Sequence, residues 1–176
     1  MKKAVFCTVL CLAVLFCAAG CKSGKEKKSV YGVNFAAYAD AGEIPESKLK
    51  IGDSIPSFDS EETESEYFSM DSEEPPFFMA ATGEFGYYYE KGDDPRIKSI
   101  MGYDTCFGFD NGTVSITVKE ALDSRNIKYT EREPVEGEIF YMSLSSGTSV
   151  IECKQFKYRL VFVFSDNALC ATYLGD

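Results

Sequence analysis

Apolar and aromatic residues gather in short runs between residues 76 and 104, and turn residues separate these runs. Two aromatic runs flank Thr82-Gly83-Glu84, and a Gly-Asp-Asp-Pro turn precedes a third apolar run. Short runs that are rich in aromatic and β-branched residues are typical of strands. The pattern therefore predicts a three-stranded meander over residues 77–81, 85–90 and 96–102.

The last third of the chain repeats this pattern. From residue 138 onward, four apolar runs are joined by Ser-Ser-Gly, by a Lys-Gln-Phe-Lys bend and by Asp166-Asn167. Residues 158–164 are apolar at positions of both faces apart from Arg159, as expected of a central strand. We therefore expect four more antiparallel strands, which form the most stable part of the fold.

The segment between these two regions is less regular. TCFGF at residues 105–109 is predicted as a short strand, and Asp110-Asn111-Gly112 as a turn. After the turn, Val114, Ile116 and Val118 alternate as they would in a strand, although the apolar positions also recur at helical spacing. Periodicity alone leaves both structures open for this segment.

We choose a helix over about residues 115–126. Thr117 and Glu120 are spaced as a capping box, and KEALDSR consists largely of helix formers. Asn126 can end the helix, because asparagine tolerates the left-handed conformation that follows many helices. A short helix combined with an antiparallel β-meander predicts an α+β fold.

The longest apolar run lies at the start of the chain. Residues 4–19 carry no charge and follow Lys2 and Lys3. Sixteen residues rise only about 24 Å as a helix, which is short of the roughly 20 residues that span a bilayer. We therefore interpret residues 1–20 as a signal peptide.

The end of this run, Ala18-Ala19-Gly20-Cys21, resembles the lipobox of bacterial lipoproteins, with Ala18 where Leu is usual. The resemblance implies cleavage before Cys21, two acyl chains such as palmitate on its sulfur, and a third on its amino group. Two or more chains give stable anchoring, since each buried methylene contributes about 0.8 kcal/mol. We expect the protein at the cell membrane or outer membrane, with its domain in the periplasm or at the cell surface. The alternative is a secretory signal followed by an unmodified cysteine.

After cleavage, 156 of the 176 residues would remain, which suits one compact domain. Residues 21–29 contain four Lys and are predicted as a flexible tether. In the alternative interpretation, these lysines contact anionic lipid headgroups. Residues 30–176 are predicted as a single α+β domain. The mature side-chain charge is −12, from 16 Lys and Arg against 28 Asp and Glu, which argues against a nucleic-acid partner.

Eight acidic residues lie between Asp59 and Glu74, which suggests a calcium site. The spacing does not support one, because the twelfth position from Asp59 is Met70 where an EF-hand loop needs Glu. Starting from Asp110, the twelfth position is Ala121. We expect no metal site, and we interpret the acidic stretch as a solvated helix or connector, with weak cation binding as the alternative.

Three consecutive tyrosines, Tyr87, Tyr88 and Tyr89, lie in the second predicted strand. On a strand, consecutive side chains point to both faces. Either the domain covers both faces, or at least one tyrosine contributes to a partner-binding surface, since tyrosine combines apolar area with a polar tip. From the sequence, these three tyrosines are the candidate binding surface of the protein.

Three cysteines remain in the mature chain besides the one at the lipobox: Cys106, Cys153 and Cys170. An odd number leaves at least one thiol unpaired in the monomer. With Val163 opposite Cys170 and Tyr158 opposite Cys153, the pleat places the two cysteines on opposite faces of the sheet, with a strand between them. We therefore predict no disulfide between Cys153 and Cys170. Buried thiols are the expected state, and a bridge from Cys106 is the alternative.

The composition excludes several catalytic sites. The chain contains no histidine, which excludes Ser-His-Asp and Cys-His catalysis and His-ligated zinc. GxSxG, GxGxxG and the phosphate-binding GxxxxGK[ST] are also absent. We therefore expect no enzyme activity and no cofactor, and a protein that binds another envelope or surface protein. The alternatives are binding of a small ligand or cation and a hydrolase that uses two carboxylates.

Residues 30–104 and 105–176 share an order of elements near their ends: an aromatic strand, a turn with Asp, eight further strand residues and Gly. This similarity leaves open two related halves that share one sheet. The ending of the second half is similar to that of small bacterial lipoproteins and of the β-lactamase-inhibitor-protein-like fold, in which a short helical segment precedes an antiparallel meander, sometimes in tandem. The resemblance covers residues 105–176, implies a fold that commonly binds other proteins, and assigns no functional residue.

Overall fold

In the computed structural model, residues 30–58, 66–69, 76–135 and 147–175 are described. This part of the chain forms an α+β fold with one antiparallel sheet of eight strands. The helical segments are η1 (Val30–Gly32), α2 (Phe35–Ala41) and α4 (Ser115–Asp123). The strands are β1 (Tyr67–Ser69), β2 (Phe77–Ala80), β3 (Phe85–Tyr89), β4 (Ile97–Tyr103), β5 (Thr130–Arg132), β6 (Thr148–Cys153), β7 (Arg159–Ser165) and β8 (Ala168–Gly175).

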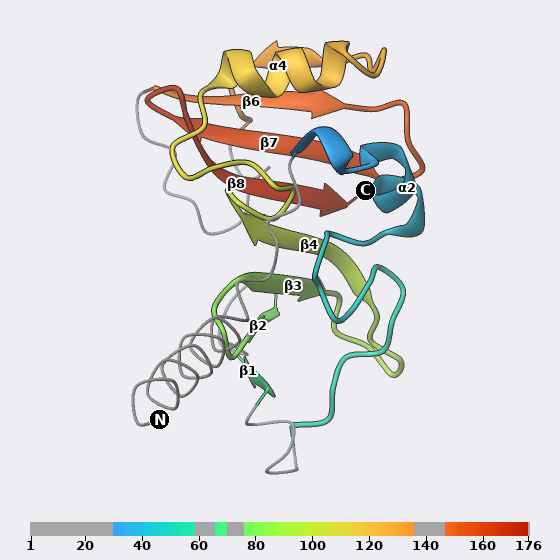
Figure 1. Cartoon of the computed structure of the whole chain (residues 1–176). Coiled ribbons are helices and arrows are strands. Elements are labelled where there is room, and N and C mark those ends of the chain that lie inside the picture. The colour runs from blue at the N-terminus through green and yellow to red at the C-terminus, as the bar shows by residue number, and fades with distance from the viewer. Residues whose placement is uncertain (1–29, 59–65, 70–75, 136–146, 176) are drawn as a thin grey trace, which may run out of the picture.

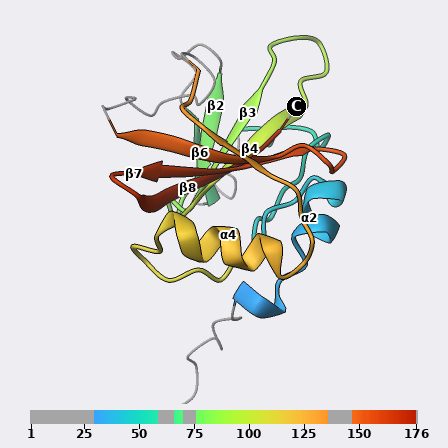
Figure 2. The same ribbon diagram turned by 90° about the horizontal axis from the view of Figure 1, so that it is seen from above.

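The strand order in the sheet is β1-β2-β3-β4-β8-β7-β6-β5. Helix α2 precedes the meander β1 to β4, and α4 precedes the meander β5 to β8 (Figure 1). The two meanders join where β4 pairs with β8, from Ile100 opposite Leu174 to Tyr103 opposite Ala171. Figure 2 shows α2 and α4 on the same side of the sheet, so this side is the helix side.

Strands β2, β3 and β4 confirm the three predicted strands of the first meander, and no strand end differs from its predicted position by more than one residue. In the last third, β6, β7 and β8 correspond to three of the four predicted strands. The remaining one, which begins at residue 138, lies outside the described residues. The pattern did not predict α2, β1 or β5, because each is three to seven residues long and β5 is largely exposed.

The strand predicted at residues 105–109 is wrong. This segment is a series of turns, in which Gly108 takes a left-handed φ of 77°. Its aromatic residues, Phe107 and Phe109, are 0% and 2% exposed because they insert into the core on the helix side instead of extending the sheet. Residues that pack a loop onto a core have the same composition as a buried strand, which explains the error.

The predicted helix is confirmed as α4, but the predicted capping box is wrong. The helix begins at Ser115, so Thr117 lies inside its first turn, and the N-cap residue Val114 makes no side-chain cap bond. The capping oxygen comes instead from the β7–β8 turn, where Asn167 Oδ1 accepts bonds from Ser115 Oγ at 2.6 Å and Ser115 N at 3.4 Å. A distant turn therefore supplies the cap that the local sequence lacks.

The end of α4 agrees with the role predicted for Asn126. This residue has a left-handed φ of 55°, and its N–H donates to the carbonyl of Asp123 at 3.0 Å. The next N–H, of Ile127, donates to the carbonyl of Leu122 at 3.0 Å. These two bonds form a Schellman ending, and the buried side chains of Ile127 and Leu122 both belong to the core.

The core on the helix side joins both meanders around Phe35, the first residue of α2. The ring centroid of Phe35 lies 5.3 Å from that of Phe107 and 5.9 Å from that of Phe162 in β7. Arg125, which follows α4, lies over the same ring at 5.0 Å and donates to the carbonyl of Val30 at 2.7 Å. The first helix is thus packed against the second meander, so the two meanders share one core.

A second apolar cluster lies on the opposite side of the sheet. Its buried members come from the strands of the second meander: Val150, Val161, Val163, Ala171 and Tyr173. Cys170 and Met101 pack against this cluster, whereas Cys153 belongs to the core on the helix side. Cys153 and Cys170 therefore lie on opposite faces, as predicted, and all three cysteines of the described residues are free thiols.

The pairing that led to this prediction differs in detail. Cys153 lies opposite Leu160, two residues further along β7 than expected. A β-bulge beside Val163 places Ala171, not Cys170, opposite that residue. The Cys170 thiol donates to the carbonyl of Val163 at 3.2 Å. The faces are nevertheless as expected, because the shift at Cys153 is an even number of residues.

Asn167 provides a test of the cap that the turn supplies to α4. Asn167→Gly keeps a residue that tolerates the left-handed φ of 67° but removes the capping oxygen, so we expect a loss of about 1 kcal/mol in unfolding free energy. Asn167→Ala should lose about 1 kcal/mol more, because it also strains the turn. Urea unfolding followed by circular dichroism measures both losses. A Gly variant as stable as the wild type would show that the cap contributes nothing.

Candidate functional site

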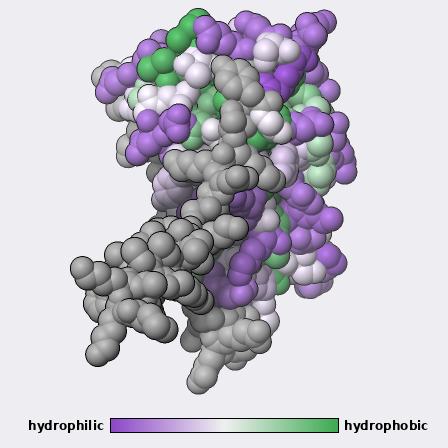
Figure 3. All heavy atoms as spheres, viewed as in Figure 1, coloured by the Kyte–Doolittle hydropathy of each residue, from purple (hydrophilic) through white to green (hydrophobic). Residues whose placement is uncertain are grey.

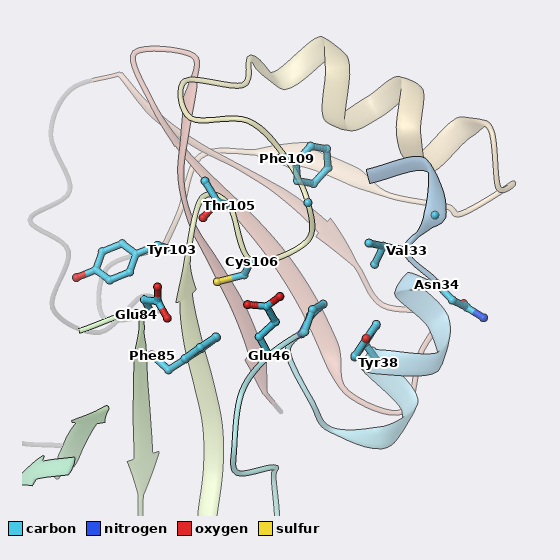
Figure 4. A pocket seen from close by; sticks show the side chains of 13 residues that line it. Val33, Asn34, Tyr38, Glu46, Glu84, Phe85, Tyr103, Thr105, Cys106 and Phe109 are labelled. Carbon is cyan, nitrogen blue, oxygen red and sulfur yellow. The ribbon is translucent and has the colours of Figure 1, made fainter. Parts of the chain in front are cut away.

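A cavity of about 560 Å³ opens on the helix side of the sheet. It lies between the segment from η1 to residue 46 and the turns at residues 103–109, next to the start of β3 (Figure 4). A volume of this size is within the usual range for ligand sites, about 300–1,000 Å³. The residues that line the cavity therefore form the candidate site.

The floor of the cavity is apolar. Val33, Phe85 and Phe109 line it and are 5%, 6% and 2% exposed. Cys106 lies between them and is held close to the sheet by Gly102, where a Cβ atom would come within 2.6 Å of the Cys106 sulfur. A glycine at the end of β4 therefore allows the turns to fold back and form this floor.

The rim of the cavity carries two carboxylates, Glu46 and Glu84, which are both exposed to solvent. Figure 4 shows that both point toward the space beside Cys106. Within the described residues, neither carboxylate forms an ion pair or a side-chain hydrogen bond, and no Lys or Arg lines the cavity. The rim is therefore a region of uncompensated negative charge above an apolar floor.

Glu46 is held at the rim by a strained turn. The N–H of Ser47 donates to the carbonyl of Ile44 at 3.0 Å, with Pro45 and Glu46 as the central residues. Glu46 has a φ of 71°, a conformation that favours Gly or Asn at this position of a type II turn. A residue with a Cβ pays roughly 1–3 kcal/mol there, and such strain is common at ligand sites.

Glu84 is placed by the turn that joins β2 and β3. Gly83 adopts a left-handed φ of 73°, and its N–H donates to the carbonyl of Ala80 at 2.7 Å. The N–H of Glu84 then donates to Thr82 Oγ1 at 3.4 Å. This tight turn directs the chain into β3, so that Glu84 stands at the rim directly before Phe85 on the floor.

The Cys106 thiol is protonated at neutral pH. Burial, which is the largest cause, and the nearby carboxylates of Glu84, Asp104 and Glu46 together raise its pKa to about 12. Thiolate is the form that attacks substrates and binds metals. Cys106 is therefore a packing residue of the floor and is unsuited to act as a nucleophile at neutral pH.

An aromatic side chain completes the wall. Tyr38 of α2 lines the cavity and packs edge-on against Phe107 with ring centroids 6.0 Å apart, whereas the ring of Tyr103 at the end of β4 points away from Cys106 (Figure 4). Aromatic faces attract cations through the negative potential of the ring. The wall and the two carboxylates therefore favour the same sign of charge in a ligand.

The binding surface predicted at Tyr87, Tyr88 and Tyr89 is not exposed: these residues are 0%, 2% and 6% exposed. Tyr87 and Tyr89 pack in the core on the helix side, whereas Tyr88 stacks on Phe77 and reaches Met101 on the opposite side. Both faces of β3 are covered, which is one of the two outcomes that the alternation allowed. The tyrosines therefore contribute to stability and lie outside the cavity.

The other predicted site residue, Cys21, lies outside the described residues. Sequence reasoning missed the cavity itself. Its floor and rim come from loops and strand ends far apart in the chain. The pattern predicts Thr82-Gly83-Glu84 only as a connection between strands and residues 105–109 only as a strand, and it does not bring the two segments together. The one local signal at Glu46 is a Glu after Pro at a turn position where Gly is usual. Many turns with this feature have no ligand site.

Among the described residues, no group of three or more Cys, Asp or Glu side chains could hold a metal ion. None of the helices in this part of the chain has the length and apolar character needed to cross a membrane. Comparisons with protein families, with curated proteins and with solved structures found no match. The function of the cavity is therefore inferred from the chemistry of its lining residues.

The strain at Glu46 can be measured with two substitutions. Glu46→Ala removes the carboxylate but keeps a Cβ at the left-handed position, whereas Glu46→Gly removes both. We expect the Gly variant to be more stable than the Ala variant by roughly 0.5–1 kcal/mol, since relief of strain exceeds the extra entropy of the unfolded chain. Urea unfolding of both variants checks this. Equal stability would show that the turn is unstrained.

The raised pKa of Cys106 predicts how fast the thiol is alkylated. With a pKa of about 12, only about one thiol in 10⁴ is ionised at pH 8, because a raised pKa favours the protonated form. The alkylation rate with iodoacetamide should rise about tenfold per unit between pH 7 and 9. Peptide mass spectrometry identifies the modified residue, and the denatured chain is the control. A rate that levels off below pH 9 would contradict the buried, protonated thiol.

Proposed function

We propose that this protein is a membrane-anchored bacterial lipoprotein that works by binding another protein of the cell envelope or surface. Residues 1–20 would be the signal peptide, acylated Cys21 the attachment to membrane lipid, and residues 21–29 the tether of a domain in the periplasm or at the cell surface. The observation that carries the binding role is the cavity, which combines an apolar floor with two rim carboxylates that have no side-chain partner among the described residues.

Binding suits this site better than catalysis. A hydrolase with two carboxylates needs one of them protonated, by burial or by a close carboxylate neighbour, so that it can donate a proton. Glu46 and Glu84 are both exposed, and the Cys106 thiol is protonated. The proposal therefore assigns no catalytic residue and no cofactor.

Binding of a free small ligand is the second candidate, and the volume of the cavity favours it, because about 560 Å³ would hold a drug-sized molecule. A ligand of this kind would occupy the same floor and rim. Capture of a protein at the rim distinguishes the two candidates, since a free small ligand brings no polypeptide to this position.

We also propose that residues 30–104 and 105–176 are related halves of one duplicated unit. The support is the order of elements, because in each half a helix precedes a four-stranded antiparallel meander and the last strands of the two meanders pair. This order is similar to the tandem form of the β-lactamase-inhibitor-protein-like fold. A shared origin with that fold would be consistent with a protein-binding role, while the cavity would still be specific to this chain.

Photocrosslinking in membranes tests the binding role. A photoreactive amino acid replaces Thr105, an exposed residue of the cavity lining, and a control replaces Ile116 on α4, which is 55% exposed. Some hydrophobic residues reach the surface at the end of the molecule where α4 lies (Figure 3). We expect a reproducible protein crosslink from position 105 and none from 116, since only the first lines the cavity.

The same experiment includes Cys21→Ser, which should release the protein from the membrane fraction and abolish the crosslink. Retention of this variant in the membrane would contradict lipid anchoring. The absence of any reproducible protein neighbour at position 105 would contradict the protein-binding role and leave the small-ligand candidate.

A further inference from the structure

We infer that the cavity receives a Lys or Arg side chain of the partner, together with an apolar side chain next to it. This inference rests on the proposed function, and it specifies the chemistry of the partner. It follows from the charge of the rim, the character of the floor, the volume of the cavity and the point at which the tether joins the domain.

The charge of the rim favours a positively charged group. Glu46 and Glu84 face the cavity, Asp104 adds a third carboxylate close enough to raise the pKa of Cys106, and no Lys or Arg lines the cavity in the described part of the chain. An incoming cation would form its ion pairs without displacing a cation already in place. An anion would meet repulsion from all three carboxylates.

The floor and wall favour an organic cation over a metal ion. Calcium and magnesium prefer six or more oxygen ligands, and two exposed carboxylates above Phe85, Phe109 and Cys106 do not offer this number. The stem of a Lys or Arg side chain is apolar and its head is charged. Such a side chain can lay its stem along the floor while its head reaches the carboxylates.

The volume indicates that more than one side chain enters. About 560 Å³ is several times the volume of a single Lys or Arg side chain, so an adjacent aliphatic or aromatic residue has room on the floor. A zwitterionic phospholipid headgroup is a weaker candidate for the same cation. Its phosphate would lie beside Glu46 and Glu84, and no cation of the described lining could receive it.

The tether determines where the partner can be. Val30 is fixed to the domain, because its carbonyl accepts a 2.7 Å bond from Arg125 and its side chain is buried. Gly32, Val33 and Asn34, directly after it, line the cavity. Nine residue steps separate Cys21 from Val30, a reach of about 32 Å when extended. An acylated Cys21 would therefore hold the cavity close to the membrane surface, where the basic segment of the partner must lie.

Peptide binding to the full chain in phosphatidylcholine nanodiscs tests the inference. One fluorescein-labelled peptide carries a single Lys between Leu and Phe, and its control carries norleucine, which has a similar shape without the charge. Fluorescence anisotropy should give at least tenfold tighter binding of the Lys peptide. This advantage should shrink as salt rises, since the contact is partly exposed.

Variants of the rim locate the effect. The double variant Glu46→Gln, Glu84→Gln should weaken the Lys peptide about tenfold and leave the norleucine peptide unchanged. A matched double variant at exposed acids away from the cavity, Asp93→Asn and Glu120→Gln, should bind both peptides as the wild type does. Because the removed carboxylates are exposed, both double variants should fold, and circular dichroism confirms that they do.

Three results would overturn the inference. The first is equal affinity for the two peptides, which includes no binding of either. The second is an unchanged affinity of the Lys peptide for the rim variant. The third is competition by phosphatidylethanolamine nanodiscs, which would identify the headgroup as the ligand. The photocrosslinking at position 105 keeps this failure separate from that of the proposed function. A protein captured there through a segment without Lys or Arg would overturn the cation chemistry while supporting the binding role.

Discussion

The packing of Phe35 against Phe162 connects two parts of the chain that are far apart in sequence. Phe35 begins α2, whereas Phe162 lies in the middle of β7. Phe107 and Phe109 pack against both rings, so the turns at residues 103–109 keep their place only while α2 is docked. Because these turns and the segment after η1 are two walls of the cavity, the site depends on the same aromatic group as the fold.

Departures from local preference coincide at the cavity. Glu46 adopts a conformation that suits glycine, two carboxylates lack partners in the described structure, and an apolar floor lies beneath them. At other left-handed positions the residue types are the usual ones, with Asn126 ending α4 and Asp166-Asn167 forming a tight turn. Proteins break local rules mainly where function requires it, so this coincidence supports the choice of the cavity as the site.

The charges of the tether and the domain have opposite signs, which gives the proposed anchoring a physical logic. Four lysines in the tether would be attracted to anionic headgroups, while the acidic domain would be repelled from the same surface. The domain would then stay within reach of the membrane without lying flat on it. The carboxylates at the rim would be accessible to a basic segment on a neighbouring protein, and the same acidity disfavours nucleic acid.

The sequence by itself determined the α+β class, most strands of both meanders, α4 and its ending at Asn126, because these follow from local periodicity and turn chemistry. It also determined the absence of histidine chemistry. Only the tertiary structure decided that residues 105–109 pack as turns and that Asn167 caps α4. It also decided that Tyr87 to Tyr89 are buried, and that Glu46, Glu84 and Cys106 line one cavity. These features depend on contacts between residues distant in the chain, which local patterns do not encode.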